Sequence, residues 1–171
     1  MGQPLSRATA ERRAAFAAVV DNEPGVLHRV VGMFAARGYN IESLTVAETD
    51  HQAHTSRITV VTRGAPEVLA QIRAQLEKII QVRSVEDLGG DPHAVERELA
   101  LYKVQTGGAG RAGVLALAEQ SDARLIQDAG DVLLFELTGA PDAIDALQAR
   151  LHPLGLVEMS RTGVLSIRRT A

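Results

Sequence analysis

One arrangement of apolar segments occurs twice in this chain of 171 residues, and it limits the possible folds more than any other feature. Each copy alternates short β-compatible segments with segments whose apolar residues recur at helical spacing, in the order βαββαβ. The first copy predicts strands over 14–20, 40–48, 57–63 and 82–88, and helices over 26–37 and 66–80. The second predicts strands over 98–105, 123–128, 132–138 and 156–160, and helices over 111–120 and 141–151, with 164–167 extending or pairing with the last strand. Units of about 75 residues in this order are typical of the ferredoxin-like α+β fold, in which two helices cover one face of a four-stranded antiparallel sheet.

A short run of turn residues, Gly89-Gly90-Asp91-Pro92, separates the two copies and is the best candidate for a linker. We therefore expect a disordered N-terminal extension over 1–13, a first domain over 14–90 and a second ferredoxin-like domain over 91–171. Domains this small bury a limited core, and the open face of each sheet needs a cover. We expect a homodimer to supply it.

The composition argues against several classes of protein. Lys and Arg number 18 against 21 Asp and Glu, and aromatic residues make up 3%, so the chain offers no obvious binding face for a phosphate backbone or for stacked bases. It has no cysteine, which removes disulfides, thiolate nucleophiles and cysteine-bound zinc. The longest apolar run near the start, 14–20, is too short to span a bilayer and lacks a signal-peptide cleavage site. We therefore expect a cytoplasmic protein that binds neither nucleic acid nor membrane.

Three patterns resemble functional sites, but one is too short to be specific and two lack a necessary part. The first six residues match the pattern for N-terminal myristoylation, which we interpret as part of the disordered extension because the pattern is short. His51 and His54 could ligate a metal, but no third ligand stands at a suitable spacing. The segment 107–111 resembles a phosphate-binding loop, but no Gly-Lys-Ser/Thr sequence follows it. We therefore expect no catalytic residue and no metal site in this chain.

The segment that joins the first predicted strand to the first predicted helix is the most informative one. Asn22 is placed to cap that helix, and Pro24 suits its first turn. Gly25 lacks a Cβ atom, so a ligand can approach the backbone there. The amides of Gly25, Val26 and Leu27 are expected to point outward at the positive end of the helix, which suits a small carboxylate.

Asn40, at the start of the second predicted strand, could offer the same amide chemistry as Asn22. Together with a small apolar pocket, these groups would fit the carboxylate and the ammonium of a free aliphatic amino acid. The residues alone leave a second interpretation open, in which the segment is a plain capped helix after a turn.

Several segments match a family pattern: Asn22-Glu23-Pro24-Gly25-Val26-Leu27, Phe34-Ala35-Ala36-Arg37-Gly38-Tyr39-Asn40-Ile41-Glu42-Ser43-Leu44 and Ser56-Arg57-Ile58-Thr59. With these segments the chain resembles the regulatory (small) subunit of acetohydroxyacid synthase, also called acetolactate synthase. The segment 93–99 with Lys103, and the segment 160–164, resemble the second domain of that family. The resemblance extends from Ala14 to Arg169.

The resemblance implies that the first domain is an ACT domain and that this chain is not an enzyme. It implies a partner, the catalytic subunit, which carries thiamine diphosphate, Mg²⁺ and FAD, so that this chain itself holds no cofactor. It further implies that the chain activates this partner and confers feedback inhibition by branched-chain amino acids, valine first, in valine, leucine and isoleucine biosynthesis. The implied effector site lies between two ACT domains and uses Asn22, Gly25 and the amides of Val26 and Leu27 from one copy, with Asn40 and Ile41 from the other.

Two other functions stay open at this point. The first is a stand-alone amino-acid sensor that regulates another enzyme or a transcription system. The second is a small enzyme on the same scaffold, which would need a set of reactive residues that the sequence does not contain. Co-purification with a catalytic subunit separates the first alternative from the function that the resemblance implies.

Overall fold

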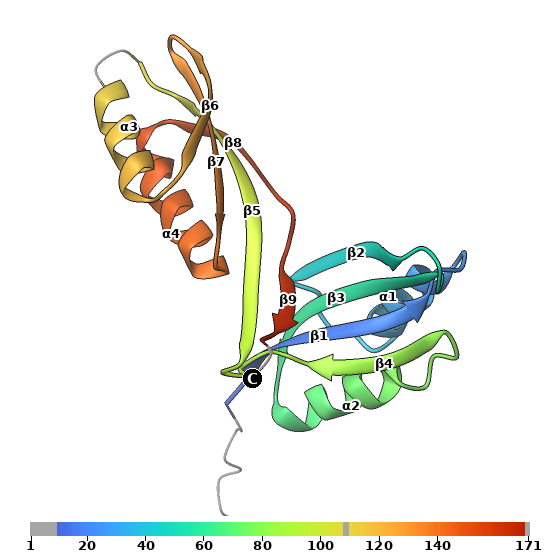
Figure 1. Cartoon of the computed structure of the whole chain (residues 1–171). Coiled ribbons are helices and arrows are strands. Elements are labelled where there is room, and N and C mark those ends of the chain that lie inside the picture. Colours follow the sequence, from blue (N-terminus) through green and yellow to red (C-terminus); the bar gives the residue numbers. More distant parts are fainter. Residues whose placement is uncertain (1–9, 108–109, 170–171) are drawn as a thin grey trace, which may run out of the picture. The chain divides into compact units, whose positions relative to one another are not determined.

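The computed structural model describes residues 10–107 and 110–169, and its contacts divide the chain into two compact units (Figure 1). Unit 1 takes in the chain up to Val95 and again from Ser166 onward, whereas unit 2 is Glu96–Leu165. The myristoylation pattern and most of the expected extension lie outside the described residues, as do Gly108 and Ala109 of the glycine-rich segment.

The end of the chain explains why the division into units differs from the expected domains 14–90 and 91–171. Strand β9 (Leu165–Arg168) pairs with β5 (Ala94–Gln105), which also pairs with the last strand of the second repeat, so β9 continues that strand along the same neighbour after a short interruption. Within unit 1, the Arg168 guanidinium lies 2.9 Å from the Asp91 carboxylate. The last described residues therefore belong to the first compact unit and not to the second.

The sheet of unit 1 is antiparallel, with the strand order β2-β3-β1-β4, and the two helices pack on one of its faces. Its elements are β1 (Arg12–Asp21), α1 (Val26–Ala36), β2 (Ser43–Asp50), β3 (Thr55–Gly64), α2 (Pro66–Leu76) and β4 (Val82–Asp87). Strand β1 begins inside the expected extension, because Arg12 and Arg13 already pair with residues of β3.

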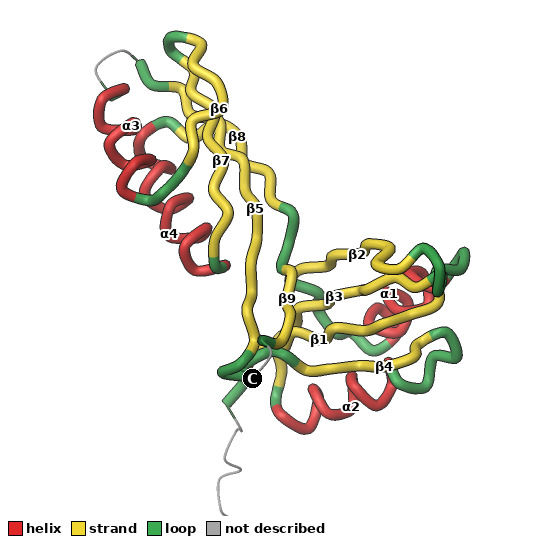
Figure 2. The backbone as a smooth tube through the Cα atoms, viewed as in Figure 1, coloured by secondary structure: helices red, strands yellow, loops and turns green. Residues whose placement is uncertain are grey.

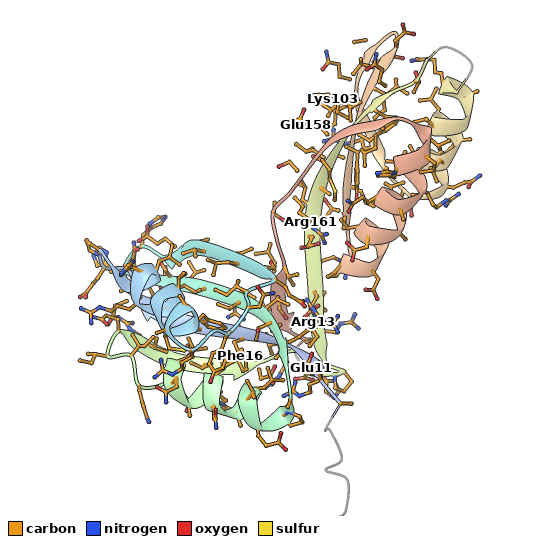
Figure 3. All side chains as sticks on the ribbon, turned by 180° about the vertical axis from the view of Figure 1, so that it is seen from behind. Glu11, Arg13, Phe16, Lys103, Glu158 and Arg161 are labelled. Carbon is orange, nitrogen blue, oxygen red and sulfur yellow. The ribbon has the colours of Figure 1, made fainter. Side chains whose placement is uncertain are left out.

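The predicted apolar run 14–20 forms the centre of β1, which lies between β3 and β4. Phe16 and Val20 face the helices and belong to the same core as Phe34 of α1 (Figure 3 labels Phe16). On the opposite face of the strand, Ala15 and Ala17 are also buried. Burial on both faces explains why the run is apolar without alternation.

Unit 2 repeats the arrangement, with the strand order β6-β7-β5-β8. Its further elements are α3 (Arg111–Gln120), β6 (Arg124–Ala129), β7 (Val132–Gly139), α4 (Pro141–Leu151), the 3₁₀ turn η1 (His152–Leu154) and β8 (Leu156–Arg161). Figure 2 shows the helices of each unit beside their own sheet. The predicted fold class, two ferredoxin-like βαββαβ units, is confirmed.

Two predicted boundaries in unit 1 are wrong. Helix α2 ends at Leu76 and not at Ile80, whose side chain is 90% exposed, so the helical spacing of isoleucines continues past the helix itself. Strand β2 begins at Ser43, so Asn40 and Ile41 lie in the connection between α1 and β2 and do not open the strand.

Tyr102 of β5 is the largest side chain that is fully buried in unit 2. Its hydroxyl donates a hydrogen bond of 2.9 Å to the Ile144 carbonyl of α4, which ties the sheet to the helix layer. Burial raises the pKa of Tyr102 to about 12, against the lowering effect of the nearby Arg161 guanidinium. The folded unit therefore holds this proton more tightly than the unfolded chain does.

Replacing the only other tyrosine, Tyr39→Phe, isolates Tyr102 for titration. We expect tyrosinate absorbance to rise with a midpoint near pH 12, and not at the ordinary value of 10.0. Because the unfolded chain already releases the proton at the lower pH, unit 2 loses stability as the pH rises between these two values. A midpoint at the ordinary tyrosine value in the folded protein would contradict the buried position of Tyr102.

Candidate functional site

The loop between β1 and α1 presents its backbone because of the conformation of Gly25. This residue occupies the N-cap position of α1 with φ +87°, a left-handed conformation that a glycine adopts at little cost. A Cβ atom built on Gly25 would have no heavy atom within 4 Å beyond the two neighbouring residues of the chain, so the space beside its backbone is open. The geometry thus provides the close backbone approach that the sequence predicts here.

The first turn of α1 has no side-chain cap, and no acidic residue stands in it. The expectation that Asn22 caps the helix is wrong, because the helix begins four residues later, at Val26. Among the described residues, the amides of Gly25 and Leu27 have no hydrogen-bond acceptor, and that of Val26 reaches the Glu23 carbonyl only at 3.4 Å. This helix start can therefore donate hydrogen bonds to an anion, in the field of the helix dipole.

A set of contacts holds the beginning of the loop against the turn between β2 and β3. The Arg83 guanidinium of β4 lies 2.7 Å from the Asp21 carboxylate and donates a longer hydrogen bond, 3.3 Å, to the Ala53 carbonyl. The backbone N–H of Asn22 donates a hydrogen bond of 2.8 Å to the backbone carbonyl of His54. The sequence does not indicate a role for Arg83, because its partner Asp21 is 62 positions away and no spacing rule links the two residues.

Asn40 and Ile41, the other two predicted site residues, lie together in the connection before β2. The Asn40 side chain is exposed, whereas the backbone carbonyl of Asn40 accepts a hydrogen bond of 2.6 Å from the buried Thr62 hydroxyl of β3. Ile41 is half-buried and packs against the core of unit 1. The sequence signal that could have drawn attention to Thr62 is a polar residue inside the apolar pattern of the predicted strand 57–63.

Within one chain, the two groups of predicted site residues lie at opposite ends of the sheet. Asn22 follows Asp21, which pairs with Thr55 at the start of β3, whereas Asn40 is bonded to Thr62 near the end of the same strand. Seven residues of extended strand separate these two ends by about 23 Å. A site that uses both groups therefore needs a second copy of the chain.

The turn between β2 and β3 gives no support to a metal site. His51 is exposed and pairs with the Glu48 carboxylate at 3.0 Å. Across the part of the chain that the structure describes, no three His, Asp or Glu side chains come together in a way that could hold a metal ion. Within the same described ranges, no helix has the length and apolar character needed to cross a membrane.

Comparison with known proteins gives family matches to most of both repeats. Residues 16–84 match the family of AHAS small subunit-like ACT domains, and residues 97–170 match the family described as the small subunit of acetolactate synthase. The chain is 41% identical over 158 residues to the acetolactate synthase isozyme 3 small subunit of Salmonella typhimurium, covering 92% of this chain and 96% of the relative. It is 42% identical over 151 residues to the acetolactate synthase small subunit of Aquifex aeolicus, covering 88% and 78%.

A solved structure supports the same assignment. The acetolactate synthase small subunit from Thermotoga maritima is similar with a TM-score of 0.84 and 30% sequence identity, over 94% of this chain and 99% of that chain. The family matches, the sequence identities and this structural likeness agree with the resemblance carried by residues 22–27 and 34–44. The chain belongs to the family of acetolactate synthase small subunits.

Proposed function

We propose that this chain acts in the cytoplasm as the regulatory subunit of acetolactate synthase. In this proposal it binds and activates the catalytic subunit and confers feedback inhibition by a branched-chain amino acid, with valine as the first candidate. The names of the relatives support the partner. The observation that carries the effector site is the uncapped start of α1, whose amides lie beside a glycine with open space around it.

In this proposal each residue has a part in binding an amino acid. The effector carboxylate accepts hydrogen bonds from the amides of Gly25 and Leu27, and from Val26 once its weak bond to the Glu23 carbonyl opens. The Val26 side chain is buried, so it contributes through its backbone, whereas Leu27 is 41% exposed and can contact an aliphatic side chain. The exposed Asn22 side chain completes this half of the site.

Pairing of two β2 strands would bring the halves of the site together. β2 is an outer strand of the sheet, and its residue Val46 is 45% exposed. Antiparallel pairing places the start of one β2, which follows Asn40 and Ile41, beside the end of the other. That end lies next to Thr55 and therefore to Asp21 and Asn22 of the second copy. The opposite outer strand, β4, offers no such arrangement, so we propose a homodimer through β2.

An effector held between two copies can act as a switch only if it binds one arrangement of the dimer more tightly than another. Coupling energies between two sites of this kind are typically about 1–3 kcal/mol. A small carboxylate bonded to one copy and an amide from the other would supply differential contacts of this kind. The catalytic chemistry and its cofactors stay with the partner subunit in this proposal.

Calorimetry on the purified chain tests the proposal most directly. We expect valine, leucine or isoleucine to bind, with valine tightest, and the binding to require the dimer. Co-purification with the catalytic subunit, followed by an inhibition assay, separates this function from that of a stand-alone sensor. A chain that binds none of the three amino acids, or that turns over a substrate unaided, would refute the proposal.

Gly25→Asp places a negative charge in the open space where the effector carboxylate would lie. We expect this variant to lose inhibition by valine while activation of the catalytic subunit is largely retained, as measured in the reconstituted enzyme. Gly25→Asn is the matched control, because asparagine also tolerates the left-handed conformation but carries no charge. The asparagine variant should keep more inhibition than the aspartate variant, and full inhibition of Gly25→Asp would place the effector elsewhere.

Asn40→His removes the side-chain amide that the second copy contributes. We expect the inhibition constant for valine to rise by about 2- to 10-fold, the usual effect of one lost hydrogen bond. Glu42→Gln serves as the control, because Glu42 lies two positions away and its side chain forms a surface ion pair with Arg63. An unchanged inhibition constant in Asn40→His would remove Asn40 from the site.

A further inference from the structure

We infer that Thr62 is a positioning residue for the effector: its buried hydroxyl fixes the backbone at Asn40 and thereby sets the affinity for the amino acid. This inference rests on the proposed function, because it concerns the half of the effector site that one copy presents to the other. Thr62 itself lies in the interior of unit 1 and would not touch the ligand.

The hydroxyl of Thr62 is held in a fixed place. Its residue is 0% exposed and sits in β3, directly opposite Ala14 of the buried strand β1. A β-branched side chain in a strand has restricted rotation about its first bond, so the direction of the hydroxyl is largely determined by the backbone. The hydrogen bond of 2.6 Å that it donates to the Asn40 carbonyl therefore connects a rigid strand to an exposed segment.

The segment around Asn40 depends on this contact because it belongs to neither α1 nor β2. On one side, the Tyr39 amide donates to the Phe34 carbonyl at 3.0 Å, and on the other the Glu42 amide donates to the Val61 carbonyl at 2.8 Å. Between these two anchors, the backbone carbonyl of Asn40 accepts its hydrogen bond from the Thr62 hydroxyl. It is thus placed to hold Asn40 in one position before an effector arrives.

A residue that binds only when correctly placed contributes more affinity if it is held there in advance. Loss of the Thr62 hydroxyl would leave the segment held by its two amide anchors and by the packing of Ile41, but it would release the backbone carbonyl of Asn40 and loosen the position of the Asn40 side chain. The expected consequence is weaker effector binding with little change in the fold, since the exposed segment can hydrogen-bond to water instead.

The experiment compares two substitutions at the same position in the full chain. Thr62→Val keeps the shape of the side chain and removes the hydroxyl, whereas Thr62→Ser keeps the hydroxyl and removes a methyl group. We expect calorimetry to show a rise of about 3- to 10-fold in the Kd for valine with Thr62→Val, and a Kd close to that of the wild type with Thr62→Ser. Arg63→Met, which breaks the neighbouring surface ion pair with Glu42, should leave the Kd unchanged.

Thermal unfolding of the same variants separates positioning from a loss of packing. A positioning role predicts that Thr62→Val weakens valine binding at temperatures well below its unfolding transition. Equal affinities in Thr62→Val and the wild type, or equal losses in Thr62→Val and Thr62→Ser, would overturn the role of the hydroxyl. If the wild-type chain binds no branched-chain amino acid, the proposed function itself fails, and the role of Thr62 fails with it.

Discussion

The uncapped start of α1 is the physical feature on which the candidate site depends. None of the four α-helices in the described part of the chain has a side chain bonded to its first amides, but α1 alone among them has a left-handed residue, Gly25, in the capping position. Water or a bound anion must then complete the hydrogen bonding of these amides. The same glycine leaves the adjacent space open, so the chain combines unsatisfied donors with access to them.

The length of the sheet adds a second constraint, because it keeps the two halves of the proposed site apart within one chain. Asp21 and Thr62 lie toward opposite ends of the β1–β3 ladder, and each half is fixed to its own end. An effector that needs both halves is therefore sensitive to the association of two copies. Binding and dimerisation are then linked, so each is expected to strengthen the other.

Periodicity predicted the two ferredoxin-like units well because their cores follow simple rules. The central strands of unit 1 are buried on both faces, those of unit 2 at alternate residues, and each helix along one face, and these positions are visible in the order of apolar residues. The pattern failed where a boundary depends on hydrogen-bond partners and not on side chains. Asn40 and Ile41 lie outside the β2–β3 ladder, which begins at Ser43, and Ile80 continues a helical spacing after α2 has ended at Leu76.

The candidate site shows the same division between local and distant information. The glycine at the helix start and the amides after it could be predicted, because they are consecutive in sequence and glycine chemistry is local. The contacts of Arg83 with Asp21 and of Thr62 with Asn40 join residues 62 and 22 positions apart. Such contacts arise from the register of the strands, and no feature of one sequence specifies that register to within a residue.

The return of the last strand to unit 1 has a consequence for dissecting the protein. The carbonyl of Ser166 accepts a hydrogen bond of 2.9 Å from Arg57 of β3, and Arg168 pairs with Asp91. Seen along the chain, residues 96–165 are thus an insertion between two separated pieces of one compact body. Trimming the protein after its first repeat would deprive Arg57 of this acceptor and Asp91 of its ion pair with Arg168.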